Sequence, residues 1–203
     1  MIKVISGEFK GRILKVPKNI RPILAQIKKS VFDILTPYIK DSLFLDLYAG
    51  SGAVGIEALS RGAKFCVFVE KQKECLRCIS ENVITLDCQN RCYIIRADIL
   101  KDLYWVEKTK SVLKERFGKE GFDIIFIGAP YVEKKCYKET TKVKLAKMST
   151  PTIEIISNSK LLSLKGILVV QHSKLETVET TSFECFRKEY YGDTTVSFFR
   201  CTC

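Results

Sequence analysis

Long hydrophobic runs are missing from this sequence. None of its 203 residues falls in a stretch of about 18 uncharged apolar residues, which a membrane-spanning helix needs. The first residues, Met1–Gly7, lack the charged and long apolar segments of a secretion signal, and there is no internal repeat or low-complexity tract. With 46% apolar and 28% charged residues, we expect a globular, cytoplasmic monomer without a membrane partner.

Histidine is nearly absent, whereas cysteine is frequent. A lone histidine after an apolar strand, here His172, is more often structural than a general base. The nine cysteines of a cytoplasmic chain are expected to be reduced and mostly buried. Four of them approach the spacing of a zinc site, but they fall inside a predicted helix and at the start of a predicted strand, so we expect no metal: Cys75, Cys78, Cys88 and Cys92.

Positive charge is concentrated in two segments. The formal net charge is +11, and residues 1–40 contribute +7 of it, with nine lysines and arginines against Glu8 and Asp33. A second basic segment covers residues 134–147. Two separated basic segments indicate a polyanionic partner, although a generally basic, solvated surface is the alternative. The residues expected to contact nucleic acid are Lys10, Arg12, Lys15, Lys18 and Arg21.

The order of apolar segments predicts an α/β fold. From residue 43, short strands rich in Val, Ile, Leu and Phe alternate with helical segments, which indicates a parallel sheet covered on both faces. Two later segments predict a closing antiparallel pair around a turn at Gly192. The expected strands are 43–48, 65–70, 92–98, 122–128, 167–171, 183–191 and 196–201, and the expected helices are 54–60, 73–86, 100–116 and 152–162.

The pattern before residue 41 is different. Residues 2–16 predict two short strands around Gly7 and Gly11, and a helix is expected from about 26 to 35, before Pro37. The chain is too short for two full-sized domains. We therefore expect a basic hairpin and helix extension at 1–40, and one Rossmann-like domain at 41–203.

A glycine-rich loop follows the first strand of that domain, at the turn where parallel α/β sheets bind ligands. Gly50, Gly52 and Gly55 also fit the dinucleotide fingerprint, so a nicotinamide or flavin enzyme is the alternative. A carboxylate at Asp46 would repel a pyrophosphate but attract the ammonium and sulfonium of S-adenosylmethionine, which favours the methyl donor. We do not expect Asp46 to cap the helix, because it lies several residues before it.

Acidic residues end the next two predicted strands. Glu70 stands where an acid binds ribose hydroxyls, and Asp98 stands where it can bond the adenine amino group or nearby backbone. Together with Asp46, they place carboxylates at the ends of three successive strands. The expected cofactor is S-adenosylmethionine, with S-adenosylhomocysteine as product.

Several motifs keep a distinctive order along nearly the whole chain. They include Ile5-Ser6-Gly7, Leu45-Asp46-Leu47-Tyr48-Ala49-Gly50-Ser51-Gly52, the segment 57–63, Val69-Glu70-Lys71 and Tyr191-Gly192-Asp193-Thr194. On these motifs the chain resembles the bacterial 16S ribosomal RNA guanine-N2 methyltransferase family. The resemblance implies a seven-stranded, mostly parallel sheet, an RNA-contacting N-terminal extension, and ribosomal RNA or the small ribosomal subunit as partner. It assigns Asp46, Gly50, Gly52, Glu70 and Asp98 to the cofactor, and we add their neighbours Tyr48, Ala49, Ser51 and Lys71.

The family's catalytic signature, Asp-Pro-Pro-Tyr, corresponds here to Gly128-Ala129-Pro130-Tyr131. In the family, the aspartate and the next carbonyl accept the two hydrogens of the target amine. Ala129 keeps the carbonyl and Tyr131 can stack on an extruded base, but Gly128 has no side chain. Asp123 cannot replace the carboxylate, because five strand residues place it roughly 16 Å away, at the other end of the sheet.

The resemblance implies methyl transfer to the exocyclic N2 of a guanine in small-subunit ribosomal RNA. The alternative is a weakly active or inactive paralogue that acts as an RNA-binding or ribosome-assembly protein. Besides Gly128, two segments differ from the family: Ile23-Leu24-Ala25-Gln26 replaces Thr-Thr-Asp-Arg, and Gln171-His172-Ser173 replaces Glu-His-Ser.

Overall fold

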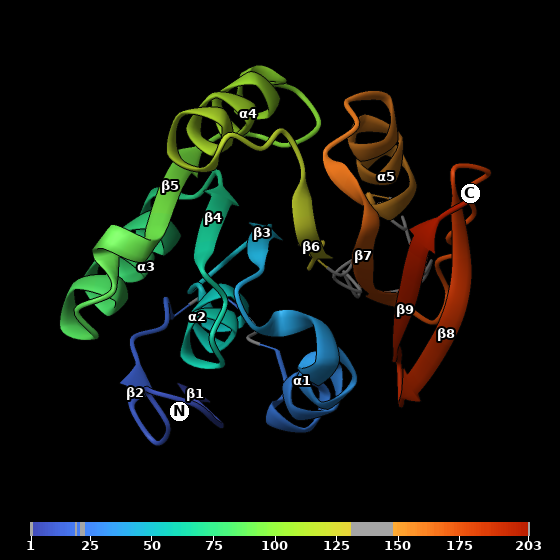
Figure 1. Ribbon diagram of the computed structural model, residues 1–203. Helices are drawn as coiled ribbons and strands as arrows, with labels where there is room; N and C mark the ends of the chain where they lie inside the picture. Colours follow the sequence, from blue (N-terminus) through green and yellow to red (C-terminus); the bar gives the residue numbers. More distant parts are fainter. Residues whose placement is uncertain (1, 19, 21–22, 131–147, 203) are drawn as a thin grey trace, which may run out of the picture.

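The computed structural model describes residues 2–18, 20, 23–130 and 148–202. Its centre is a seven-stranded sheet with the order β5-β4-β3-β6-β7-β9-β8 (Figure 1). The first five strands in this order are parallel, and β9 runs antiparallel between β7 and β8. The predicted mostly parallel, Rossmann-like sheet is therefore confirmed. The strands are β3 (Leu43–Leu47), β4 (Phe65–Glu70), β5 (Cys92–Arg96), β6 (Phe122–Ile127), β7 (Leu162–Ser173), β8 (Phe183–Tyr191) and β9 (Thr194–Cys201).

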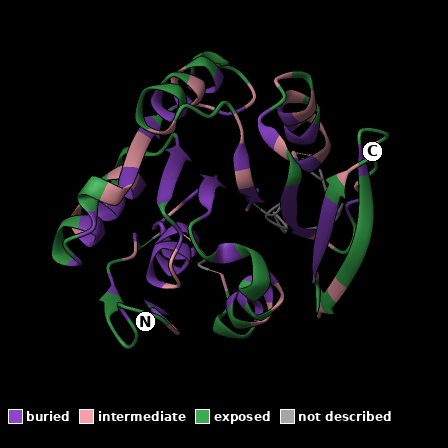
Figure 2. Cartoon of the chain, viewed as in Figure 1, coloured by how far each residue is buried: buried purple, intermediate pink, exposed green. Residues whose placement is uncertain are grey.

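Helices cover both faces of this sheet (Figure 1). Side chains alternate between the two faces of a strand, so Phe44 packs on the first group of helices while Leu43 and Leu45 pack on the second. Every residue of β3 and β4 is buried, which explains their continuous apolar runs (Figure 2). The first group is α1 (Ala25–Ile39), α2 (Ala53–Ser60) and α3 (Lys73–Thr85), and the second is α4 (Tyr104–Phe117) and α5 (Ser149–Asn158).

The predicted N-terminal hairpin is present as β1 (Ile2–Lys3) and β2 (Ile13–Leu14), which pair antiparallel. Gly7 has a φ of 84°, and a Cβ there would lie 1.8 Å from the carbonyl oxygen of Ser60, so no side chain fits between the hairpin and α2. Buried residues of the hairpin and of α1 belong to the same apolar cluster as α2 and one sheet face. The domain boundary at residue 40 remains a prediction.

The largest differences from the expected boundaries are at the end of α1, at the start of α4, and between α5 and β7. Helix α1 continues past Pro37, because the buried face extends to Ile39 and proline costs only one hydrogen bond near a helix end. Helix α4 starts late, because the N–H groups of residues 101 and 102 donate to the Asp98 carbonyl and form a turn. Strand β7 begins at Leu162, where a helix was expected to end, and its pairing with β6 shifts register before Ile167.

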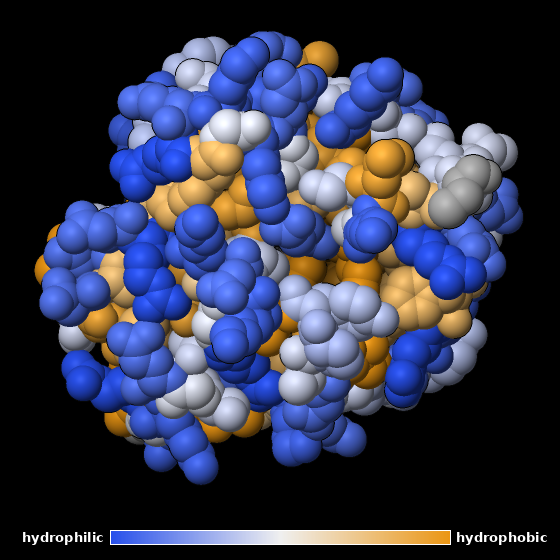
Figure 3. Space-filling view, viewed as in Figure 1, coloured by the Kyte–Doolittle hydropathy of each residue, from blue (hydrophilic) through white to orange (hydrophobic). Residues whose placement is uncertain are grey.

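None of the described helices is both long and apolar enough to cross a membrane. The space-filling view shows hydrophilic side chains over most of the visible face, with hydrophobic residues exposed between them near its middle (Figure 3).

Candidate cofactor and substrate site

The three carboxylates predicted to bind the cofactor lie on adjacent strands. Asp46 is in β3, Glu70 ends β4, and Asp98 follows β5. Because these strands are parallel neighbours, their carboxyl ends meet at one edge of the sheet. Lys71 also lies there, with its Nζ 3.6 Å from Oδ2 of Asp98. The structure thus brings together groups that are up to 52 positions apart in the sequence.

Glu70 organises the glycine-rich loop. Its Oε2 accepts a hydrogen bond from the Gly50 N–H at 2.9 Å, and its Oε1 accepts bonds from the N–H groups of Lys71 and Gln72 at 2.8 and 2.9 Å. An ionised carboxylate has about four acceptor positions, and these bonds occupy three. Among the bonds of the described residues, one acceptor position is therefore not used.

The loop itself is a tight turn with left-handed backbone at Tyr48, Gly50 and Gly52. A Cβ at Gly52 would lie 3.2 Å from the side chain of Ile79 on α3, so the glycine there also permits close packing. Ala49 is buried, with its N–H donating to the Val69 carbonyl at 3.2 Å. The loop therefore crosses from β3 toward the end of β4.

Asp46 lies beneath this loop and is 1% exposed. Its Oδ2 accepts a hydrogen bond from the Gly55 N–H at 2.9 Å, in the first turn of α2. The expectation that Asp46 does not cap this helix was wrong, because the tight turn folds the start of α2 back over the end of β3. Burial raises the pKa of Asp46 to about 8, against the lowering effect of the Gly55 bond and with a smaller raising effect from Glu70.

Tyr48 connects the loop to α5, on the other face of the sheet. Its hydroxyl lies 2.8 Å from Oγ1 of Thr152. The Thr152 hydroxyl donates to the Met148 carbonyl at 2.7 Å, so the Tyr48 hydroxyl is the donor in the contact with Thr152. Burial raises the pKa of Tyr48 to about 12 and keeps the phenol neutral.

The segment that corresponds to the family's catalytic signature lies beside the loop. The Gly128 N–H donates to the Leu47 carbonyl at 3.1 Å, Ala129 is buried and Pro130 is exposed, while Tyr131 lies outside the described residues. Among the described atoms, a Cβ at Gly128 would lie nearest to the edge of the Phe126 ring, at 3.0 Å, which is closer than ordinary van der Waals contact, and 3.9 Å from the Leu47 carbonyl oxygen. A small side chain is therefore accommodated there if the ring moves by a few tenths of an ångström.

Asp123 lies at the opposite edge of the sheet, as predicted. Its Oδ2 accepts a hydrogen bond from the Leu43 N–H at 2.8 Å, at the start of β3. It therefore cannot take the place of the missing carboxylate at Gly128.

Four of the five basic residues predicted to contact RNA are described, and all four are exposed on the hairpin and the segment after it: Lys10, Arg12, Lys15 and Lys18. Arg12 donates to the Thr85 carbonyl at 3.3 Å, and Lys15 pairs with Glu81 at 2.9 Å. Arg21 and the second basic segment, 134–147, lie outside the described residues. The described part of this predicted surface runs along the α3 side of the molecule.

A known family, described as conserved hypothetical protein 95, matches residues 2–200. The chain belongs to this family. The Bacillus subtilis protein named "Putative rRNA methyltransferase YlbH" is 32% identical over 203 residues, which cover 98% of each chain. "Ribosomal RNA small subunit methyltransferase D" of Buchnera aphidicola is 32% identical over 179 residues, which cover 87% of this chain and 81% of that protein. The resemblance deduced from the motifs is confirmed.

The fold has close structural counterparts. "Putative methyltransferase yhhF from Escherichia coli" superposes with a TM-score of 0.76 at 22% identity, covering 100% of this chain and 98% of that one. The prediction of a methyltransferase is confirmed by these relatives, and neither the inactive paralogue nor a nicotinamide or flavin enzyme is favoured.

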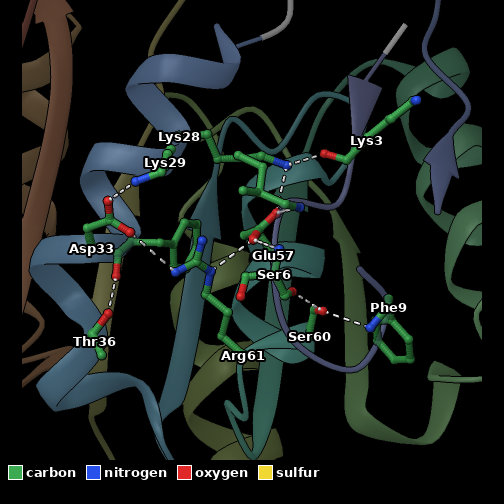
Figure 4. A network of polar contacts seen from close by, with 12 residues as sticks. Lys3, Ser6, Phe9, Lys28, Lys29, Asp33, Thr36, Glu57, Ser60 and Arg61 are labelled. Atoms are coloured by element: carbon green, nitrogen blue, oxygen red, sulfur yellow. Dashed lines mark hydrogen bonds and ion pairs between the residues drawn. The ribbon is translucent and has the colours of Figure 1, made fainter. Parts of the chain in front are cut away.

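Glu57 is a buried acidic residue with a structural role that pattern reasoning did not single out, although it lies in one of the motifs. It is fully buried on α2 and accepts hydrogen bonds from the Ile5 and Ser6 N–H groups at 2.8 and 3.0 Å (Figure 4). It also pairs with Nζ of Lys28 and Nε of Arg61, each at 2.9 Å. Burial lowers the pKa of Lys28, and Glu57 partly opposes this effect. This cluster attaches the hairpin and α1 to the helix that follows the cofactor loop.

His172 is buried within β7 and does not lie free at the site. Its Nε2 is 3.0 Å from Oγ of Ser197 and its Nδ1 is 3.0 Å from the Ser173 carbonyl oxygen. Burial lowers its pKa. The structural interpretation of this histidine is therefore favoured. Among the described residues, no group of three or more histidine, cysteine or acidic side chains is arranged to hold a metal ion.

Proposed function

We propose that this chain transfers a methyl group from S-adenosylmethionine to the exocyclic N2 of a guanine in small-subunit ribosomal RNA. The observation that carries the proposal is the arrangement at one edge of the sheet. The loop 46–52, Glu70 and Asp98 lie together at this edge, and the segment 128–130 lies directly beside the loop. The cofactor and the target guanine would therefore meet at the carboxyl ends of β3 and β6.

The residues present suit the proposed cofactor. Asp46 is a buried carboxyl group with a raised pKa, and in the described part of the chain no lysine or arginine pairs with it. An ammonium group of a ligand would favour its ionised form. Glu70 retains one acceptor position for a ribose hydroxyl, and Asp98 is a partly exposed acceptor at the end of the next strand.

When bound, the cofactor supplies a methyl group activated by its sulfonium. The protein's part is to aim the guanine amine at that methyl group, and such positioning accounts for most of the acceleration. The Ala129 carbonyl would accept one amine hydrogen and so help to orient the nitrogen lone pair. The bound cofactor would thus supply the methyl group and keep the electron pair of the broken C–S bond on sulfur, and the methylated amine would lose its proton to water.

The substrate proposal rests on the family and on charge. The relatives named above act, by their names, on ribosomal RNA. The exposed basic residues of the hairpin side provide a surface that neutralises phosphates. We propose that this surface positions the RNA, while the segment 128–131 receives the target base.

The test is transfer of a labelled methyl group to unmodified small-subunit RNA and to unmodified small subunits. We expect label in N2-methylguanine after nuclease digestion. Glu70→Ala should abolish saturable cofactor binding in calorimetry, whereas Asp123→Asn, at the opposite edge of the sheet, should bind as wild type does. Cofactor binding without transfer to either substrate would favour the RNA-binding paralogue, and normal binding by folded Glu70→Ala would mean that the cofactor site is misassigned.

A further inference from the structure

Asn82 on α3 contacts two segments that the proposed function assigns to different ligands. Its Nδ2 donates to the Lys15 carbonyl at 3.0 Å and to the Ser51 carbonyl at 3.1 Å. Its Oδ1 accepts a hydrogen bond from the Lys15 N–H at 2.8 Å. Lys15 belongs to the predicted RNA surface, and Ser51 lies in the cofactor loop between its two glycines.

The side chain is 3% exposed, so water does not compete freely for these bonds. Both amide hydrogens and one acceptor position of the carboxamide are in use. Buried hydrogen bonds are costly to leave unmade, so a displacement of Lys15 or of Ser51 is resisted by the other segment through the same amide.

Other contacts attach these two segments to α3 or bring them close to each other. The ammonium of Lys15 pairs with Glu81, the residue next to Asn82. Farther along, Ile20 approaches Gly50, with its Cγ2 3.9 Å from the position of a Cβ on that glycine. On the inner side, Ile79, one turn before Asn82, packs under Gly52. Helix α3 therefore supports the basic segment and the cofactor loop at the same time.

We propose that Asn82 is a positioning residue that couples the basic segment at Lys15 to the cofactor loop at Ser51, so that cofactor and RNA strengthen each other's binding. The inference rests on the proposed function. When the cofactor holds the loop in its bound conformation, it fixes the position of the Ser51 carbonyl. The side-chain amide of Asn82 is then fixed as well, and with it the main chain of Lys15. Coupling of this kind is reciprocal, since each ligand must improve the affinity of the other by the same factor.

The experiment measures the affinity of the full chain for an unmodified small-subunit RNA transcript, with and without saturating S-adenosylhomocysteine. The product is used so that no methyl transfer occurs. We expect the wild type to bind RNA roughly 5- to 150-fold more tightly with the cofactor product, the usual range of such coupling. In Asn82→Ala the ratio should fall below about twofold, because the link is removed while both ligand sites remain.

Two control variants separate coupling from simple loss of stability or charge. Ser60→Ala removes a buried hydroxyl that joins the hairpin to α2, bonding the Phe9 N–H at 2.9 Å and the Ser6 carbonyl at 2.6 Å, without touching the cofactor loop (Figure 4). It should keep the wild-type ratio. Lys15→Ala should weaken RNA binding through the lost charge but also keep the ratio, because Asn82 holds only the main chain of residue 15.

If Asn82→Ala does not unfold cooperatively, Asn82→Asp takes its place. It keeps the shape and the acceptor for the Lys15 N–H, but when ionised it cannot donate to the Ser51 carbonyl or to the Lys15 carbonyl, so the same loss of coupling is expected. An unchanged ratio in a folded Asn82 variant, or a wild-type ratio of one, overturns the inference while leaving the proposed function intact. A wild type that binds neither RNA nor the cofactor product overturns both.

Discussion

Binding of S-adenosylmethionine is expected to release a proton from Asp46. The carboxyl is buried, and its pKa is raised to about 8, so about 0.9 of the molecules carry the proton at pH 7. The α-amino group of the ligand, with an ordinary pKa near 8, is already mostly charged at that pH. Placing this ammonium beside Asp46 favours the ionised carboxylate, and the proton must leave.

Two pH dependences follow from this shift. Cofactor affinity should rise between pH 6 and about pH 8, because fewer carboxyl groups need to lose a proton on binding. The folding stability of the unliganded protein changes with pH in the opposite direction to cofactor affinity. The folded pKa of about 8 lies above the ordinary value of 3.8, so the stability from this group is fully present below pH 3.8 and is lost as the pH rises through 8.

Calorimetry in two buffers of different ionisation enthalpy measures the protons released per cofactor bound. We expect a value between about 0.5 and 1 at pH 7 for the wild type and close to zero for Asp46→Asn, which cannot ionise. The variant still offers an oxygen to the Gly55 N–H, so α2 should keep its cap. If the wild type releases no proton, or Asp46→Asn releases as much as the wild type, Asp46 acts only as the cap of α2 and the electrostatic argument fails.

Three further predictions concern the catalytic segment, the buried ion pair and the basic surface. Gly128→Asp should raise the rate of single-turnover methyl transfer by up to about 10- to 150-fold, which is the effect of one charge-assisted hydrogen bond. Cofactor affinity should change little. A folded variant that transfers methyl more slowly than the wild type would show that the site is built around glycine. Glu57→Ala should lower the free energy of unfolding in a urea titration by about 3–5 kcal/mol, because Lys28 stays buried without its partner, whereas Glu81→Ala, at a partly exposed ion pair, should have little effect. Equal effects of the two substitutions would contradict the argument. The exposed basic residues to be neutralised together are Lys10, Arg12, Lys15 and Lys18. The slope of log RNA affinity against log salt concentration should then flatten by roughly 1–3 units. An unchanged slope would place the RNA surface elsewhere.

Much of the architecture was predictable because the signals are local. Strands β4 and β8 begin and end where their apolar and alternating patterns do, and Gly62 ends α2 with a φ of 100°. The carboxyl ends of successive parallel strands must share an edge, so the meeting of Asp46, Glu70 and Asp98 was also predictable. The motifs identified the family without a structure.

The boundaries that were wrong lie where tertiary contacts override a local rule. Pro37 ordinarily ends a helix, but the next buried residue, Ile39, extends α1 beyond it. Leu162 continues a helical pattern, yet it pairs with Phe122 and starts β7. In both cases the burial of one apolar side chain decides between two local structures of similar propensity.

The sequence by itself determined the fold class, the family and the edge of the sheet where we propose that the ligands bind. Only the tertiary structure decided which atoms meet there, as in the contacts of Asp46 with Gly55, Tyr48 with Thr152, and Asn82 with Lys15 and Ser51. The partners in the last two are 31 to 104 positions apart. Periodicity reports which face of an element is buried, but a hydrogen bond requires two atoms within about 3 Å, and that distance is set only when helices and loops pack on the finished sheet.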